Sequence, residues 1–324
     1  MADDPRVSAY PVRVALVMDH RLSGLRMRKV EMIMKKNAGL FVAAAFAVAA
    51  ALTSGTAFGG ETGAGETQAP QQTQQQQQIT PQELFVLMAG EAEKGNSEAM
   101  LTLGSLYERG VGTPRNFTKA FEWYRKAANT GVPAGYYNVG VCYEIGMGNA
   151  GDMTEAFNNF EKSAELGLSQ GLYKLASLYF TGQGTQKNEP WGVELLNRAA
   201  AKGHSGAAND LGVIFFEGTF GQAKDPNKAY EWFSRAADLG NGEAMKNVAI
   251  FYRDGIGRKA DPQQELKWYL LAGVAGFPQQ ALIPAVNKIK EGMNEQQLKQ
   301  VETDVNNWID AFRAKQAQQQ QAQQ

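Results

Sequence analysis

Apolar residues recur through residues 96–277 at the spacing of short helices. Ala99, Leu103, Leu106 and Gly110 stand at positions i, i+4, i+7 and i+11, which places them on one face of a helix. The sequence therefore predicts a first helix that turns this face toward a neighbour.

A second helix follows directly. It carries Ala120, Trp123, Tyr124, Ala127 and Ala128 on one face. Small residues at matched positions let two helices approach closely, and the aromatic rings fill the space beside them. We expect the two helices to form a tightly packed pair.

The pair recurs at an almost constant period. The closing glycines are Gly131, Gly167, Gly203, Gly240 and Gly276, at intervals of 36, 36, 37 and 36 residues. The predicted copies are residues 96–131, 132–167, 168–203, 204–240 and 241–277. One helix pair cannot bury its own apolar face, so the copies must stack.

Glycine, aspartate and proline mark the predicted helix ends. Gly110 suits a left-handed residue just past a helix, and Gly112 gives the next turn similar freedom. Asp225-Pro226 is typical of a helix cap followed by proline at the first helical position. Copy four departs from the double-glycine pattern, with Gly218-Thr219-Phe220-Gly221 and one extra residue.

The repeated phrase resembles the Sel1-like repeat family. The matching segments are residues 103–112, Leu-Gly-Ser-Leu-Tyr-Glu-Arg-Gly-Val-Gly, and residues 120–128, Ala-Phe-Glu-Trp-Tyr-Arg-Lys-Ala-Ala. The tetratricopeptide repeat has a shorter period of about 34 residues and lacks the double-glycine loop. The resemblance implies an all-α fold, a right-handed α-solenoid of antiparallel helix pairs, and a surface that binds other proteins.

Both ends of the array are predicted to be capped by helices. Residues 80–95 would form the N-terminal cap, and residues 278–315 the C-terminal capping helices. The apolar stripe from Leu298 to Phe312 follows helical spacing and would close the last repeat. A membrane-binding or partner-binding helix is the alternative for this stripe.

The segments outside the array have other predicted roles. Residues 34–59 combine Lys35 and Lys36 with an apolar run and small residues, which is typical of a secretory signal peptide. We expect residues 1–33 to be a disordered leader that arises from a misassigned start. The Gln-rich segments at residues 60–79 and 316–324 are predicted to be a disordered linker and a disordered tail.

Charge argues against nucleic acid as a partner. The chain has a net charge of −1, and residues 60–324 alone carry 24 basic and 29 acidic residues. Phosphate binding needs a basic face, so we expect a protein or peptide partner instead. The predicted location is periplasmic or secreted, with membrane contact only through the signal peptide before cleavage.

No residues in the sequence suggest a catalytic, cofactor or metal site. Cys142 stands at the position of Leu106 and is expected to be a small buried residue, with a reactive thiol as the alternative. His204 follows Gly203 in an inter-repeat turn, where a structural hydrogen bond is expected. No histidine or cysteine cluster has metal-ligand spacing. We predict that the protein is not an enzyme, binds no metal and needs no cofactor.

The outer face of the predicted first helices carries the candidate binding residues. Tyrosine, phenylalanine and amide side chains provide large contact areas and hydrogen bonds to a peptide backbone. The predicted protein-binding residues are Tyr137, Asn138, Val141, Tyr173, Lys174, Phe180, Asn209, Asp210 and Phe216, with Asn247 continuing the polar row. The alternative is that this stripe packs neighbouring first helices together.

The predicted function is a non-enzymatic scaffold or adaptor that binds a peptide or protein on the surface of the solenoid. Two alternatives remain at this point. A cysteine-rich branch that resembles Sel1 proteins is associated with penicillin binding and β-lactamase-like activity, which implies an envelope hydrolase or penicillin-binding protein. This chain has one cysteine and lacks the paired cysteines of that branch. The other alternative is a secreted effector that binds a host protein.

Overall fold

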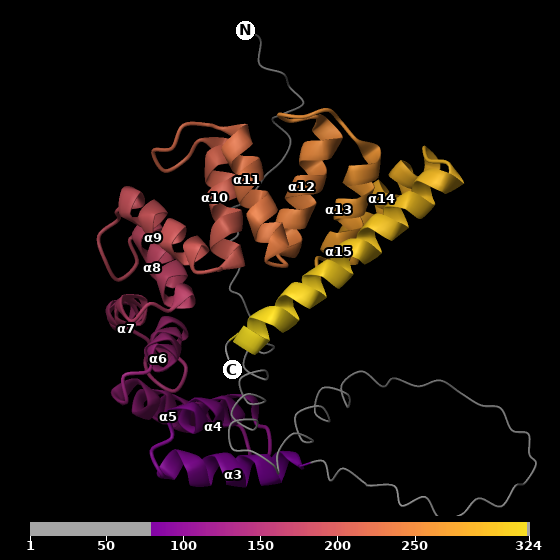
Figure 1. The fold of residues 1–324 in the computed structure, drawn as a ribbon. Coiled ribbons are helices and arrows are strands. Elements are labelled where there is room, and N and C mark those ends of the chain that lie inside the picture. Colours follow the sequence, from indigo (N-terminus) through magenta and orange to yellow (C-terminus); the bar gives the residue numbers. More distant parts are fainter. Residues whose placement is uncertain (1–78, 323–324) are drawn as a thin grey trace, which may run out of the picture. The chain divides into compact units, whose positions relative to one another are not determined.

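The computed structural model describes residues 79–322, and every regular element in that range is an α-helix. These residues divide into two compact units, 79–151 and 152–322. The predicted leader, the signal peptide and all of the linker before Ile79 lie outside the described residues. Helices that follow one another lie side by side and antiparallel within each unit (Figure 1). The all-α fold of helix pairs is therefore confirmed.

The first unit holds the N-terminal cap, copy one and the first helix of copy two. Its core joins Met88, Leu103 and Leu106 in one cluster and Tyr124 and Cys142 in another. Cys142 is fully buried, as expected for a small apolar residue. The helices are α3 (Pro81–Glu93), α4 (Ser97–Arg109), α5 (Phe117–Asn129) and α6 (Pro133–Ile145).

The second unit holds the remaining helices around one continuous apolar core. Its repeat helices are α7 (Met153–Glu165), α8 (Ser169–Thr181), α9 (Glu189–Ala201), α10 (Ser205–Glu217), α11 (Pro226–Asp238), α12 (Gly242–Asp254) and α13 (Pro262–Val274). The C-terminal helices are α14 (Gln279–Glu291) and α15 (Glu295–Ala322). Each repeat helix has 13 residues because capping and glycine positions recur with the repeat.

The helix ends follow the predicted chemistry. Each first helix ends at a glycine in the left-handed conformation, with φ between 64° and 73° at Gly110, Gly146, Gly182, Gly218 and Gly255. Asp225 and Asp261 accept backbone hydrogen bonds at the starts of α11 and α13, each followed by proline. These contacts satisfy donors and acceptors that a helix leaves open at its ends.

In copies one to three, the second loop glycine lies against the backbone at the start of the preceding second helix. A Cβ atom at Gly112 would overlap the Pro81 carbonyl oxygen at the start of α3. Gly184 meets the Met153 carbonyl oxygen at the start of α7 in the same way. The loop of one copy thus lies directly on the backbone of the preceding second helix, which explains why this position lacks a side chain.

The C-terminal cap is longer than predicted. Val301 and Val305 of the stripe on α15 are buried. The ring centroids of Trp308 on α15 and Trp268 on α13 are 6.3 Å apart. The helix continues to Ala322, whereas the sequence predicts a disordered tail from residue 316. Glutamine and alanine favour helix, and neither glycine nor proline interrupts the segment, so the helix can continue beyond its packed part.

Gly104 tests how closely the two helices of a pair must pack. A Cβ atom there would lie 2.6 Å from the buried Tyr124 ring, whereas one at Gly90 of α3 would have no neighbour within 4 Å. We expect Gly104→Ala to lower the free energy of unfolding by about 1–3 kcal/mol. Gly90→Ala should raise it by up to about 1 kcal/mol, because alanine favours helix.

Urea unfolding of the full chain, followed by circular dichroism, measures both changes. Equal effects of the two substitutions would show that the close packing at Gly104 has no energetic role.

Candidate protein-binding surface

A row of polar side chains links the first helices of copies three, four and five. The Tyr173 hydroxyl on α8 donates to the Asp210 carboxylate on α10 at 2.9 Å. The Asn247 amide on α12 donates to the Asn209 carbonyl oxygen on α10 at 3.2 Å. Asn209 and Asp210 are consecutive residues of α10, so the two contacts form one polar ladder. All four side chains are partly exposed.

His204 holds one end of this polar ladder. Its ring stacks on Tyr173, with centroids 4.4 Å apart and planes at 21°. Its Nδ1 atom accepts from the Ala207 backbone N–H at 3.0 Å and so caps α10. The structural hydrogen bond predicted for His204 is confirmed, but its stacking on Tyr173 was not predicted.

The environment of Asp210 disfavours its charged form. Burial raises the pKa of this carboxyl from 3.8 to about 6, although the hydrogen bonds from Tyr173 and Asn209 oppose the shift. The polar ladder therefore contains a carboxyl group that is easier to protonate than an exposed aspartate.

Two of the predicted aromatic residues lie near the C-terminal ends of α8 and α10, the helices that carry Tyr173 and Asp210. Phe180 on α8 stacks on Phe220, with ring centroids 4.4 Å apart. Phe180 also lies over Gly192 of α9, where a Cβ atom would come within 2.6 Å of its ring. Phe216 on α10 lies 5.5 Å from Phe251, and the Lys224 ammonium group lies 5.6 Å from the Phe216 ring.

Phe220 has a backbone conformation that its residue type disfavours. Its φ is 52°, which makes it the one non-glycine residue with positive φ in the part of the chain that the structure describes. It stands two residues after Gly218, where the other copies have the second loop glycine. This departure was visible in the sequence, and stacking on Phe180 offsets part of the strain of the left-handed conformation.

The predicted residues of the first unit offer less surface. Tyr137 and Asn138 on α6 are only 8% and 6% exposed, whereas Val141 is partly exposed. Lys174 on α8, in the second unit, is partly exposed, with its ammonium group 5.9 Å from the Phe160 ring. The ladder of the second unit is thus more accessible than the predicted stripe on α6.

Inter-repeat packing accounts for part of the stripe. Tyr173 contacts Asp210 of the next copy, and Asn209 contacts Asn247 of the copy after that. These contacts fix the side chains in place, as the packing alternative expects. Because amides and carboxylates have more than two hydrogen-bonding positions, the same side chains retain capacity toward a partner.

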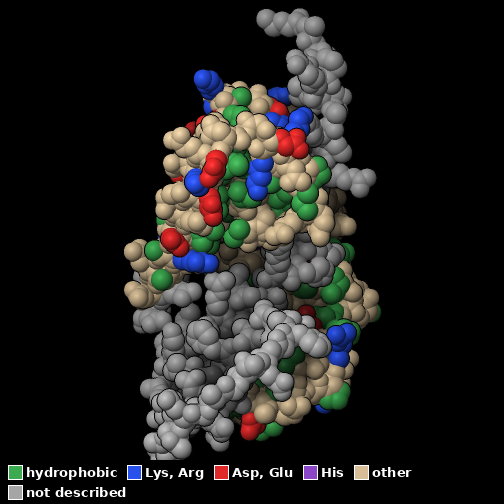
Figure 2. All heavy atoms as spheres, turned by 90° about the vertical axis from the view of Figure 1, so that its right-hand side faces the viewer, with side chains coloured by type: hydrophobic (Ala, Val, Ile, Leu, Met, Phe, Trp, Pro, Cys, Tyr) green, Lys and Arg blue, Asp and Glu red, His purple; other side chains and the backbone are tan. Residues whose placement is uncertain are grey.

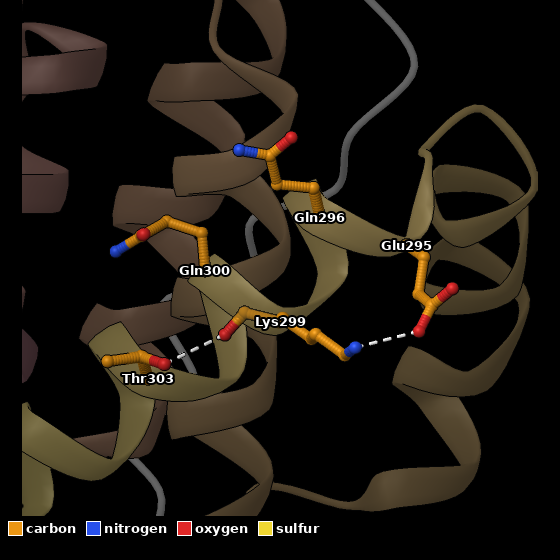
Figure 3. Close-up of a pocket in the computed structure, with 5 residues that line it drawn as sticks. All are labelled: Glu295, Gln296, Lys299, Gln300 and Thr303. Atoms are coloured by element: carbon orange, nitrogen blue, oxygen red, sulfur yellow. Dashed lines mark hydrogen bonds and ion pairs between the residues drawn. The ribbon is translucent and has the colours of Figure 1, made fainter.

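Other surface features contribute less. Figure 3 shows a shallow hollow on α15 lined by Glu295, Gln296, Lys299, Gln300 and Thr303. Lys299 forms an ion pair of 2.8 Å with Glu295, and its carbonyl oxygen accepts a hydrogen bond from the Thr303 hydroxyl. All five residues come from one helix face, so no site converges there.

In Figure 2, acidic and basic side chains are interspersed on the coloured surface. No group of metal-ligating side chains occurs within residues 79–322. Over the same range, no helix is both long and apolar enough to cross a bilayer.

Comparison with known sequences decides the family. The Sel1 repeat model matches residues 97–132, 133–168, 169–204, 205–241 and 242–276, each within one residue of the predicted copies. The chain belongs to the Sel1 repeat family. Sel1 repeats generally mediate protein–protein interaction, and their solenoid is generally a non-catalytic scaffold. No curated protein matches the chain.

Two solved structures are similar to the chain, and the first shares its fold. A Sel1 repeat protein from Oxalobacter formigenes is 27% identical with a TM-score of 0.61, over 72% of this chain and 94% of that chain. The immunity protein Pa5087 from Pseudomonas aeruginosa is 21% identical with a TM-score of 0.45, over 61% of this chain and 76% of that chain.

The raised pKa of Asp210 makes the stability of the fold depend on pH. Its pKa is raised to about 6 in the folded protein, so the fold loses stability as pH rises from about 4 through 6 and Asp210 ionises. Asp210→Asn keeps an acceptor for Tyr173 without the charge. We expect this change to raise the free energy of unfolding at pH 7 by about 1–2 kcal/mol, less than the pKa shift alone would give, because Asp210 is partly exposed. Below pH 4 it should have no such effect, because Asp210 is then protonated.

Thermal or urea unfolding at pH 4 and pH 7 measures this difference. Asp238→Asn, at an exposed position of α11, is the control and should show no comparable gain at pH 7. A gain of the same size at both pH values would contradict the burial of a charged Asp210.

Proposed function

We propose that this Sel1 repeat protein is an exported, non-enzymatic scaffold that binds an extended segment of a partner protein along α8, α10 and α12. The observation that carries the proposal is the polar ladder of Tyr173, Asp210, Asn209 and Asn247. Its side chains are partly exposed and already held by hydrogen bonds.

Pre-ordered side chains favour binding because little conformational entropy is lost when the partner arrives. The ladder supplies a carboxylate and two amides in a row, which match the alternating donors and acceptors of an extended backbone. Phe180 and Phe216 lie on the same two helices and would contact apolar side chains of the segment.

Export is supported by the sequence alone. The apolar run after Lys35 and Lys36 is followed by small residues, as in a signal peptide. A partner would then be found in the periplasm or outside the cell.

The test begins with the tagged full chain expressed in the source organism. Proteins captured from envelope and culture fractions are identified by mass spectrometry, and the binding of the purified partner is measured by calorimetry. We expect Asn209→Ala with Asn247→Ala to weaken binding about tenfold, because each lost hydrogen bond contributes about 0.5–1.5 kcal/mol.

Asn197→Ala is the matched control. This partly exposed asparagine lies on the second helix α9, where its amide donates to the Val193 carbonyl oxygen at 2.9 Å. Equal affinities of the control and the double variant would exclude the ladder as the binding surface. A chain confined to the cytosolic fraction would contradict export.

A further inference from the structure

A second hollow lies in the first unit, at the loop end of copies one and two. Its volume is about 820 Å³, and Arg109 at the end of α4, Arg115 and Phe117 at the start of α5, and Ile145 and Met147 at the end of α6 line it. None of these residues belongs to the polar ladder, so the hollow is independent of the proposed function.

The apolar wall of the hollow is not required by the repeat. Phe117 is 43% exposed and Ile145 is 51% exposed. At the position of Phe117, the other copies have Met153, Glu189, Pro226 and Pro262. At the position of Ile145, they have Arg109, Thr181, Glu217 and Asp254. At each of the two places, four of the five copies therefore fold without an aromatic or branched apolar residue, and copies three, four and five lack one at both.

The charge of the hollow is set by two arginines. Arg109 and Arg115 are exposed, and neither forms an ion pair with a side chain of residues 79–322. The Arg115 guanidinium group lies 5.8 Å from the Phe117 ring centroid, beside the apolar wall. Arg109 also stands at a helix C-terminus, where a cation is favourable, but this does not explain Arg115.

Glu108 limits which anion could bind. Its carboxylate lines the same hollow and accepts from the Tyr124 hydroxyl at 2.5 Å. A dense polyanion would be repelled by this fixed carboxylate, whereas single carboxylates can reach the two guanidinium groups as bidentate partners. The exposed Phe117 and Ile145 add a place for an apolar side chain.

We propose that this hollow binds an acidic peptide segment of a partner protein. One aliphatic or aromatic side chain of the segment packs between Phe117 and Ile145, and its flanking carboxylates pair with Arg109 and Arg115. Arginine and aromatic residues are enriched at protein–protein interfaces.

Methyl NMR of the full chain tests this directly. The isoleucine and methionine methyl groups are labelled with carbon-13, and the Ile145 and Met147 signals are assigned by substitution. The probes are two synthetic hexapeptides, one alternating Asp with Leu and one alternating Lys with Leu. The Asp peptide should shift both signals in a saturable manner, and the Lys peptide should not.

The variants copy residues that other repeats already tolerate. Phe117→Glu and Ile145→Thr reproduce Glu189 and Thr181 of copy three, and Arg109→Gln with Arg115→Gln removes the two charges. Each variant should keep the melting temperature within a few degrees and weaken Asp-peptide binding at least fivefold. Lys224→Gln, which changes the Arg115 position of copy four, should bind normally.

Three results would overturn the proposal. They are equal shifts with both peptides, no shift at millimolar Asp peptide, and unchanged binding by the double arginine variant. The first would show apolar adsorption without charge recognition, and the last would place the peptide elsewhere.

Discussion

In copies one to three, the contact between the loop and the backbone of the preceding second helix sets the spacing between neighbouring helix pairs. Gly112 meets the Pro81 carbonyl oxygen, and Gly184 meets the Met153 carbonyl oxygen, at distances that leave no room for a side chain. Each contact joins a turn to the first residue of a helix, so the position of one pair fixes the next within its unit. The constant period of these copies follows, because an insertion in either helix would move the loop away from this contact.

The proposed binding surface includes places where a copy departs from the repeat. Phe220 occupies a glycine position in a left-handed conformation and stacks on Phe180, and Gly192 stands where α5 has Ala120 and leaves room for that ring. Asp210 places a carboxyl group with a raised pKa between two helices, where copy one has Thr102. Local departures of this kind cost stability, and they are expected where a surface serves a partner.

The sequence predicts the repeat well because the repeat depends on local chemistry. Gly110 ends a helix, Asp225 starts one, and Ala99 with Leu103 marks a buried face, all of which follow from spacing along one segment. The pairing of Tyr173 with Asp210 depends on the rotamers and register of two helices 37 residues apart, so it could not be predicted. For the same reason the burial of Tyr137 and Asn138 was not apparent, since both stand on the face that a single helix pair would expose. The continuation of α15 to Ala322 differs from the predicted disordered tail, because glutamine and alanine favour helix and the segment contains no helix breaker.

Two loop glycines, one in copy three and one in copy four, allow the effect of the packing contact on stability to be measured apart from the effect of backbone strain. Gly184 and Gly221 have φ values of 69° and 75°, but only Gly184 meets another backbone, because a Cβ atom at Gly221 would have no neighbour within 4 Å. Urea unfolding of Gly184→Ala and Gly221→Ala in the full chain is therefore the most direct measurement. Both should lose about 1 kcal/mol from the left-handed conformation, and Gly184→Ala should lose about 1–3 kcal/mol more from the overlap with Met153. Equal losses would contradict the conclusion that this backbone contact stacks the copies.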